Sequence, residues 1–309
     1  MMRALRVGAL FAAYTVIGYG GDYAVGLLAP GAQARFGTDM AQLVTLGESE
    51  APMVVVVDVQ PTIVSRVRVR HGDECAYEVE REFSVAADAS GMLSLEVGSG
   101  ELHVEGREGL EEIVVVGMLC ASHEEYLDEM DVSIERSNGG EVVIQAMYPS
   151  DRNDTHGRSV ARIDLTVLMP RGMTVDIDDS SGGIDVSGTG DLSVDDSSGD
   201  LRVHDVDGSL RIDDSSGSLD VQNVSGDVEI DDGSGGLELR MIGGSVHLRD
   251  GSGGIEATRI DGDVVVESDG SGGIDVRDVG GDFVVSRDGS GGIRHSGVEG
   301  RIDVPRKRR

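Results

Sequence analysis

The sequence predicts an all-β protein whose C-terminal part is a parallel β-solenoid, preceded by an irregular β region with one short helix. The first observation is a tetrapeptide, Asp-Xaa-Ser-Gly, that recurs seven times, with its serines 17, 18, 18, 18, 19 and 19 residues apart. The second is that each repeat holds two short segments in which apolar and polar residues alternate, the periodicity of a half-buried strand. The third is a composition with 46 glycines, no Trp and 3% aromatic residues, so Val, Ile and Leu must form the core.

Stacking of the repeats explains how such short strands are stabilised. One repeat cannot bury its apolar residues by itself, whereas stacked repeats bury them in continuous inward columns of equivalent side chains. Parallel strands ~4.8 Å apart would give about seven coils of 17–19 residues over residues 171–304, with a length of roughly 30 to 35 Å. The predicted columns are Ile184, Leu201, Leu219, Leu237, Ile255, Ile274 and Ile293 for the first segment, and Val194, Ile212, Ile230, Leu248, Val266, Val285 and Val304 for the second.

The chain begins with a signal-like export segment, residues 1–34. Two arginines among the first six residues precede a short apolar run, Val7–Gly21, and small residues precede cleavage candidates after Gly20 and after Ala34. The run is too short for a good transmembrane helix, so we expect no span once the signal is removed. These features predict export to the periplasm, the cell envelope or the extracellular space. An uncleaved hydrophobic start and a misassigned initiation codon are the alternatives.

Residues 35–70 are expected to form an irregular segment, and residues 71–170 a β region. The β region should contain one short helix over His123–Met130, with Tyr126, Leu127 and Met130 available for packing. A polar, turn-rich stretch, Tyr148–Ser159, is expected to be a loop. The further expected elements are an imperfect early coil over Met92–Gly106 and strands at Val114–Val116, Val142–Ile144 and Ile163–Leu168.

Two other local features bear on the cell compartment and on the chain end. Cys75 and Cys120 fit one disulfide in an exported chain, but two free buried thiols are the alternative, and their spacing matches no metal motif. The basic tail, residues 305–309, follows the last coil. Its proline and positive charges discourage another strand from pairing with the open solenoid edge. The alternative is a weak tether to an anionic lipid or envelope polymer.

The net charge excludes one class of partner. The chain has 26 Lys and Arg against 57 Asp and Glu, which gives a net charge of −31. Phosphate recognition requires a basic face, so we expect no nucleic-acid binding.

Acidic residues also form a ladder in the repeat. Stacking places like carboxylates near 5 Å apart, which costs ~1 kcal/mol per neighbouring pair in water, and bound cations are one way to offset that repulsion. The simpler interpretation is structural, because an Asp at a turn accepts backbone N–H groups two residues on and Ser-Gly supplies a left-handed position. Apart from weakly bound Ca²⁺, no cofactor is expected. The candidate cation ligands are Asp178, Asp179, Asp195, Asp196, Asp213, Asp214, Asp231 and Asp232.

These features resemble a bacterial family of envelope β-solenoid domains named as adhesins, whose biochemical function is largely undefined. The resemblance covers roughly Glu78 to Val304. Its motifs specify a fold more than an activity, so it implies an adhesion-like role only as a label. The matching pieces are Cys75–Val85, the early coil, the helix that precedes a strand, Leu168–Gly172 and the glycine-marked coils.

The sequence therefore favours a non-catalytic cell-envelope scaffold or adhesin-like protein that presents repetitive acidic turns to a partner, either a protein or a polysaccharide. The first alternative is a Ca²⁺- or cation-dependent binding module that uses the aspartate ladder. The second is a carbohydrate-active enzyme, which is disfavoured because none of the seven histidines lies in a motif beside a nucleophile. The open ends of a solenoid also allow end-to-end self-association.

Overall fold

The structure is a computed structural model that describes residues 15–20, 23–28, 53–58, 64–68, 75–87, 89–137, 140–149 and 160–305. It divides into two compact units, Met1–Thr62 and Ile63–Arg309. In the first unit, β1 (Thr15–Gly20), β2 (Tyr23–Leu28) and β3 (Met53–Asp58) form an antiparallel sheet in that order. Most of the predicted export segment, much of the irregular segment, the predicted loop after Pro149 and the basic tail after Pro305 lie outside the described residues.

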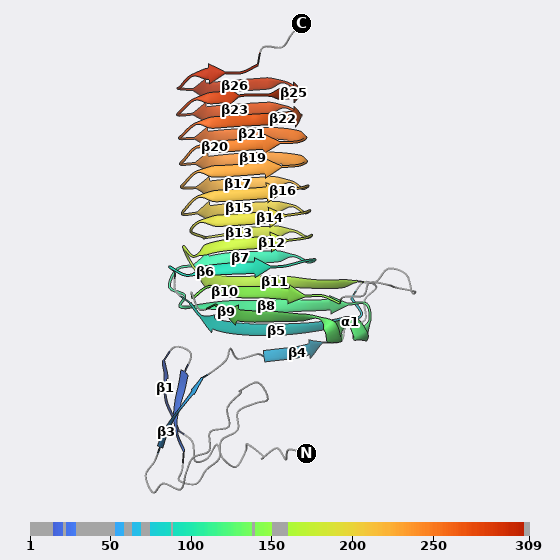
Figure 1. Ribbon diagram of the computed structural model, residues 1–309, viewed down its shortest axis with the longest axis vertical. Coiled ribbons are helices and arrows are strands. Elements are labelled where there is room, and N and C mark those ends of the chain that lie inside the picture. Colours follow the sequence, from blue (N-terminus) through green and yellow to red (C-terminus); the bar gives the residue numbers. More distant parts are fainter. Residues whose placement is uncertain are drawn as a thin grey trace. The chain divides into compact units, whose positions relative to one another are not determined.

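In the second unit the chain winds between two sheets, as Figure 1 shows. Sheet 1 runs β27-β24-β22-β20-β18-β16-β14-β12-β6-β10-β9, with β25 paired to β22, and sheet 2 runs β26-β23-β21-β19-β17-β15-β13-β7-β11-β8-β5-β4. The strands of sheet 1 are β6 (Met92–Glu96), β9 (Asp131–Arg136), β10 (Val142–Met147), β12 (Thr174–Asp179), β14 (Leu192–Asp196), β16 (Leu210–Asp214), β18 (Val228–Asp232), β20 (Val246–Asp250), β22 (Val264–Ser271), β24 (Phe283–Val285), β25 (Asp288–Ser290) and β27 (Ile302–Asp303). The strands of sheet 2 are β4 (Val64–Arg68), β5 (Tyr77–Ala86), β7 (Leu102–Arg107), β8 (Glu112–Ala121), β11 (Ala161–Pro170), β13 (Ile184–Ser187), β15 (Leu201–Val206), β17 (Leu219–Val224), β19 (Gly235–Ile242), β21 (Gly253–Ile260), β23 (Ile274–Val279) and β26 (Ile293–Val298).

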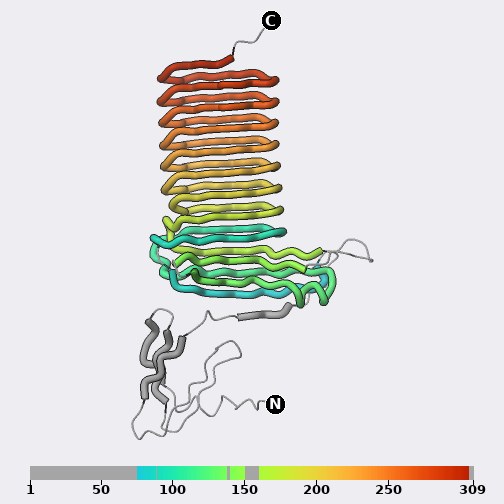
Figure 2. The backbone as a smooth tube through the Cα atoms, viewed as in Figure 1, coloured from blue at the N-terminus to red at the C-terminus, as the bar shows by residue number. Residues whose placement is uncertain are grey.

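The predicted β-solenoid and its register are confirmed. Ile184 pairs with Leu201, and the same column continues coil by coil to Ile293. The second column pairs in register from Val194 to Val285. Both columns are buried between the sheets until the last coil, where Ile293 is only half-buried. Figure 2 shows the coils stacked one above another. The fixed repeat length sets this register, because every coil returns equivalent residues to the same position.

A cap of longer strands covers the first coil. The early coil is confirmed, since β6 joins sheet 1 and β7 joins sheet 2, each next to the first regular coil. Below it, β11, β8 and β5 pair antiparallel, and β10 is parallel to β6 but antiparallel to β9. The short helix α1 (Glu124–Glu129) lies within the predicted range and leads into β9. The cap pairs the N-terminal solenoid edge, which would otherwise expose unpaired backbone groups.

The two cysteines form a disulfide between Cys75 and Cys120, with the Cα atoms 5.5 Å apart. The bond joins the residues before β5 to the end of β8, its partner strand. Of the two alternatives that the sequence left open, the structure therefore contains the disulfide. No helix in the described part of the chain is both long and apolar enough to cross a bilayer.

Candidate functional site

The eight aspartates predicted as cation ligands fall into two columns on opposite sides of sheet 1. In β18, Asp231 is exposed on the outer face, whereas Asp232 points inward and is 2% exposed. Successive side chains of a strand point to opposite faces, so each aspartate pair is split. Among the described residues, no group of three or more His, Cys, Asp or Glu side chains is arranged to hold a metal ion. The binding of a cation by these residues stays a prediction. The exposed members are Asp178, Asp195, Asp213 and Asp231, and the buried members are Asp179, Asp196, Asp214 and Asp232.

The inward aspartates form a continuous row that we call the aspartate column. Its members pair in register at the ends of successive sheet 1 strands. The first six members are between 1% and 4% exposed, and the last, Asp288, is half-buried. The column therefore places carboxyls at a spacing of ~4.8 Å inside the protein, where water screens them little. Its members are Asp179, Asp196, Asp214, Asp232, Asp250, Asp269 and Asp288.

Backbone hydrogen bonds explain why aspartate occupies this column. Ser198, Ser216 and Ser234 each donate a backbone N–H to the Oδ1 of the aspartate two residues earlier, at 3.0 Å. The predicted turn role of the aspartates is thus present in the structure. The other carboxyl oxygen is less well satisfied. Oδ2 has no hydrogen-bond partner in the first four members, and at Asp250 and Asp269 neither oxygen meets a well-aligned N–H or hydroxyl donor.

Burial shifts the protonation of the column. It raises the pKa of Asp179 and of Asp214 to about 6 and that of Asp250 to about 7, and neighbouring carboxylates add to the shift. The pKa of Asp232 is also raised, chiefly by burial, although the N–H of Ser234 favours the ionised form and opposes the change. A charged carboxylate loses its hydration when buried, so the proton is retained to a higher pH.

Glycine is required where the chain turns from sheet 1 to sheet 2. Gly253 has φ +153°, and a Cβ placed there would lie 1.4 Å from the carbonyl oxygen of Gly235 in the preceding coil. The repeated Ser-Gly of the sequence therefore marks a column of closely stacked backbone. Next to it, Gly254 has room, because the nearest atom to its added Cβ lies 4.0 Å away.

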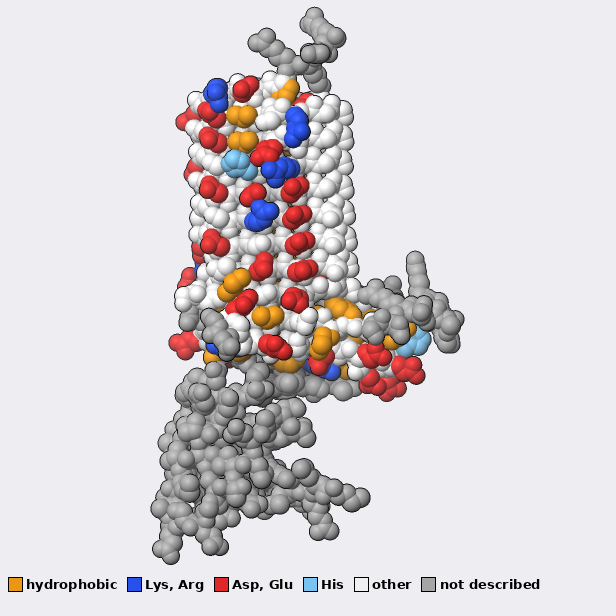
Figure 3. Space-filling view, in the orientation of Figure 1, with side chains coloured by type: hydrophobic (Ala, Val, Ile, Leu, Met, Phe, Trp, Pro, Cys, Tyr) orange, Lys and Arg blue, Asp and Glu red, His pale blue; other side chains and the backbone are white. Residues whose placement is uncertain are grey.

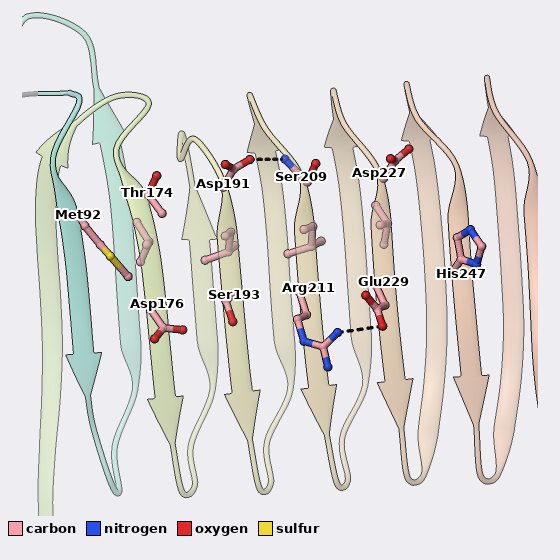
Figure 4. A pocket seen from close by; sticks show the side chains of 14 residues that line it. Met92, Thr174, Asp176, Asp191, Ser193, Ser209, Arg211, Asp227, Glu229 and His247 are labelled. Carbon is pink, nitrogen blue, oxygen red and sulfur yellow. Dashed lines mark hydrogen bonds and ion pairs between the residues drawn. The ribbon is translucent and has the colours of Figure 1, made fainter.

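The outer face of sheet 1 carries a shallow groove of about 580 Å³. Figure 4 shows the side chains that line the groove. One equivalent outward position on successive coils holds Asp176, Ser193, Arg211, Glu229 and His247. Arg211 Nη1 lies 2.8 Å from Glu229 Oε1. The groove runs across the strands and is open, so it suits an extended chain better than a small molecule that must be enclosed.

The groove is flanked by a row of carboxylates, which we call the outer acidic row: Asp178, Asp195, Asp213 and Asp231. Arg249 occupies the equivalent position in the next coil and lies 3.6 Å from Asp231 and 2.6 Å from Glu267. Figure 3 shows acidic side chains following one another from coil to coil along this molecule. The first coils thus present repeated negative charge at a fixed spacing.

Side-chain pairs that suggest catalysis are scattered. Ser122 Oγ and His123 Nδ1 are 2.9 Å apart, but they are adjacent in the chain and exposed before α1. His204 Nδ1 lies 3.0 Å from Asp205 Oδ2, on a coil of the solenoid. A nucleophile, a base and a group that orients the base are not assembled in any one place among the described residues.

Sequence reasoning missed a second kind of aspartate. Asp191 and Asp227 each accept the backbone N–H of a serine one coil further on, Ser209 and Ser245, at 2.8 and 2.7 Å. The sequence signal for this role is that an aspartate recurs directly before strands of sheet 1. A column of left-handed residues with φ of 57–63° was missed as well, although aspartate or asparagine at three of its five positions is typical of that conformation. These residues are Asp205, Asn223, Met241, Arg259 and Asp278.

Comparisons with known proteins bear on the family. Similar solved structures include a "putative cell adhesion protein" from Clostridium sporogenes ATCC 15579, with 16% identity and a TM-score of 0.23, and a "putative adhesin" from each of two other bacteria. These are Bacteroides fragilis NCTC 9343 (10%, 0.29) and Parabacteroides merdae ATCC 43184 (10%, 0.26). In that order, the alignments cover 80%, 79% and 74% of this chain and 100%, 97% and 96% of the other chains. The TM-scores are too low for the similarity to indicate function.

A comparison with curated proteins found no match. The family model described as Toastrack DUF4097 matches residues 121–307, which include the short helix and all the regular coils. The resemblance inferred from the glycine-marked coils is confirmed by this match. Because the match spans more than half of the chain, the protein belongs to the Toastrack DUF4097 family.

Proposed function

We propose that the protein is a non-catalytic binding scaffold of the bacterial cell envelope that presents its outer acidic row and the adjoining groove to a repetitive partner. The observation that carries this proposal is the in-register repetition of outward side chains on sheet 1. A rigid solenoid holds such side chains one strand spacing apart, at ~4.8 Å, without the ordering cost that a flexible chain would incur.

Repetition favours many weak contacts over one strong contact. Each of the first four regular coils offers a carboxylate of the outer acidic row and a polar side chain of the groove. A partner with regularly spaced cationic or hydrogen-bond-donating groups, on a polysaccharide or a protein, would engage several coils together. Linked contacts raise the overall affinity by far more than any one of them supplies.

The envelope location is supported by chemistry of the N-terminal part. The Cys75–Cys120 disulfide is typical of proteins that fold in an oxidising compartment. The cationic, apolar start of the sequence is typical of an export signal. A non-enzymatic role is supported by the equivalence of the coils, since a catalytic serine or aspartate would differ in its surroundings from its counterparts.

The test is co-sedimentation of the purified protein with cell-envelope fragments. A variant with the four aspartates of the outer acidic row changed to Asn should lose most of its binding, because all four contacts of the row are weakened at once. The matched control changes four carboxylates on the outer face of sheet 2 to amides and should bind as the wild type does. These control residues are Asp185, Asp220, Glu238 and Glu256.

Two results would contradict the proposal. The first is equal binding by both charge variants and the wild type. The second is recovery of the protein in the cytoplasmic fraction of its cells, with an unprocessed N-terminus. Sequencing the N-terminus of the fractionated protein supplies that second measurement and decides between the cleavage candidates.

A further inference from the structure

The C-terminal end of the aspartate column places three carboxyls one above another on successive coils. Asp250 pairs in register with Asp269, and Asp269 pairs with Asp288 in the next coil. Asp250 is 4% exposed and Asp269 is 3% exposed. Each carboxyl acts electrostatically on the next, Asp250 with Asp269 and Asp269 with Asp288. An ionised carboxylate can only accept hydrogen bonds, so two such neighbours can hydrogen-bond to each other only when one of them carries a proton.

We propose that Asp250, Asp269 and Asp288 form a proton-binding site, in which a proton shared between successive carboxyls joins each coil to the next. The orphaned carboxyl oxygens of Asp250 and Asp269 are the second observation that leads to this site. They lie inside the protein and lack a well-aligned donor, and a proton on the neighbouring carboxyl supplies one. An unpaired buried carboxylate would instead bear the full cost of lost hydration.

The arginines near these carboxyls point away from them, and in the last coil His295 occupies the inward position paired with Val276, with its ring 6.0 Å from that of Phe283. Arg249 directly precedes Asp250 in β20, points outward, and pairs with Glu267 and Asp231 on the outer face. The equivalent positions in the next coils are an outward serine, Ser268, and an exposed arginine, Arg287. The charges that act on Asp250 and Asp269 are carboxyls of the column itself, including Asp232. The inward residues of sheet 2 that close this part of the core are the buried apolar side chains Leu239, Ile255, Ala257, Ile274 and Val276.

A proton fits this position better than a metal ion does. Calcium takes about six to eight oxygen ligands, whereas an ion between two successive coils of this column adjoins only two of the three carboxyls, which offer four oxygens. A proton needs only one oxygen on each side. The raised pKa of Asp250, about 7, and the raised pKa of Asp269 agree with protons retained near neutrality.

The site links the stability of the solenoid to pH. Its protons are bound more tightly in the folded chain than in the unfolded chain, where aspartate has its ordinary pKa of 3.8. The stabilisation is therefore complete below that value and is lost as the pH rises toward about 7. Above that pH the carboxyls repel one another, and the last coils should separate more readily.

The first experiment detects the protons in the wild-type full chain. With ¹³C-labelled aspartate, infrared and NMR spectra recorded near neutral pH should contain protonated carboxyl signals, which ordinary aspartates do not give there. Spectra in which every aspartate is ionised at about pH 6 would overturn the proposal. This measurement needs no variant, so it decides the question even where a substitution prevents folding.

The second experiment compares Asp269→Asn with Asp261→Asn, an exposed aspartate of the same coil. On unfolding near pH 6, the wild type should release protons, and Asp269→Asn should release up to about one fewer. The control should match the wild type. An unchanged proton release in Asp269→Asn would contradict the site. So would a rise in wild-type melting temperature with Ca²⁺ that Asp269→Asn abolishes and Asp261→Asn retains, because it would assign the position to a metal ion.

Discussion

At the residue scale, the position of a side chain along its strand decides what its chemistry does. Asp213 and Asp214 are neighbours at the end of β16, yet the first is exposed and the second is 2% exposed. The Asp214 carboxyl loses its hydration to the core, and this burial raises its pKa to about 6. The same residue type is therefore a solvated charge on the outer face of the sheet and a buried hydrogen-bond acceptor at a turn on the inner face.

This difference predicts a pH effect. Below the ordinary aspartate pKa of 3.8 the buried carboxyl is protonated in both the folded and unfolded chain, and its contribution to stability is complete. Between 3.8 and about 6 the unfolded chain ionises first, so the free energy of unfolding falls as the pH rises. Asp214→Asn should therefore flatten this part of the pH profile. Urea unfolding at several pH values measures it.

Asp213→Asn is the matched control for that change. It removes the same charge one residue away on the outer face, so its free energy of unfolding should stay within about 0.5 kcal/mol of the wild type and its pH profile should keep the wild-type slope. Equal profiles for the two variants would show that burial of Asp214 is not the cause.

A glycine pair gives a second prediction at this scale. Gly253→Ala should destabilise the protein by about 3 kcal/mol or more, because its Cβ would meet the Gly235 carbonyl at 1.4 Å and its φ is +153°. Gly254→Ala should change stability by less than about 1 kcal/mol, since the nearest atom is 4.0 Å away. Thermal melts of the two variants test this, and equal losses would contradict the close stacking of the turn.

At the scale of elements, two kinds of pairing hold the protein together. The coils pair parallel strand on parallel strand, and each contacts only the coils before and after it. The cap pairs β5, β8 and β11 antiparallel, in strands of ten residues each. The long cap strands supply a fixed edge on which the first short strands of the solenoid can assemble.

The disulfide should matter most for this cap. It closes a loop with a sequence separation of 45 residues between Cys75 and Cys120. Changing both cysteines to serine should lower the free energy of unfolding by about 2–4 kcal/mol, because the unfolded chain regains the freedom that the cross-link removes. Melts with and without a reducing agent should show the same loss in the wild type. The double-serine variant should be insensitive to the reductant, and a sensitive variant would indicate another cause.

At the scale of the whole molecule, the repeat makes the solenoid tolerant of changes in length. Deletion of residues 217–234 removes 18 residues and joins Ser216 to Gly235, which restores the Asp-Xaa-Ser-Gly pattern. The shortened chain should fold, because each coil contacts only its neighbours and equivalent neighbours remain. Circular dichroism and limited proteolysis should show an intact β protein with a modestly lower melting temperature.

Deletion of residues 217–225 is the control for this experiment. It removes half a coil and brings strands of sheet 2 into positions of sheet 1, so the inward columns no longer continue. This variant should aggregate or be degraded by the protease. Equal resistance of the two deletions would contradict the requirement for register.

Much of this architecture was predictable from local periodicity. The spacing of the Ser-Gly pairs determined the coil length, and the alternation of Ile, Leu and Val with polar residues determined which side chains face inward. The split of Asp231 from Asp232 was predictable as well, since the alternation in β18 continues to Asp232, but the aspartates were assigned to the turn instead of the strand end. Strand positions and inward residues can be inferred from this sequence because the same local pattern occurs seven times in the chain.

Tertiary structure alone decided the cap and the chemistry of the aspartate column. The antiparallel order β11-β8-β5 joins segments far apart in the chain, and nothing in their separate patterns specifies which strand is the neighbour of which. The raised pKa of Asp250 depends on burial and on carboxyls one coil away on either side. Periodicity is a property of a short stretch of chain, whereas strand partners and desolvation depend on residues that meet only when the chain has folded.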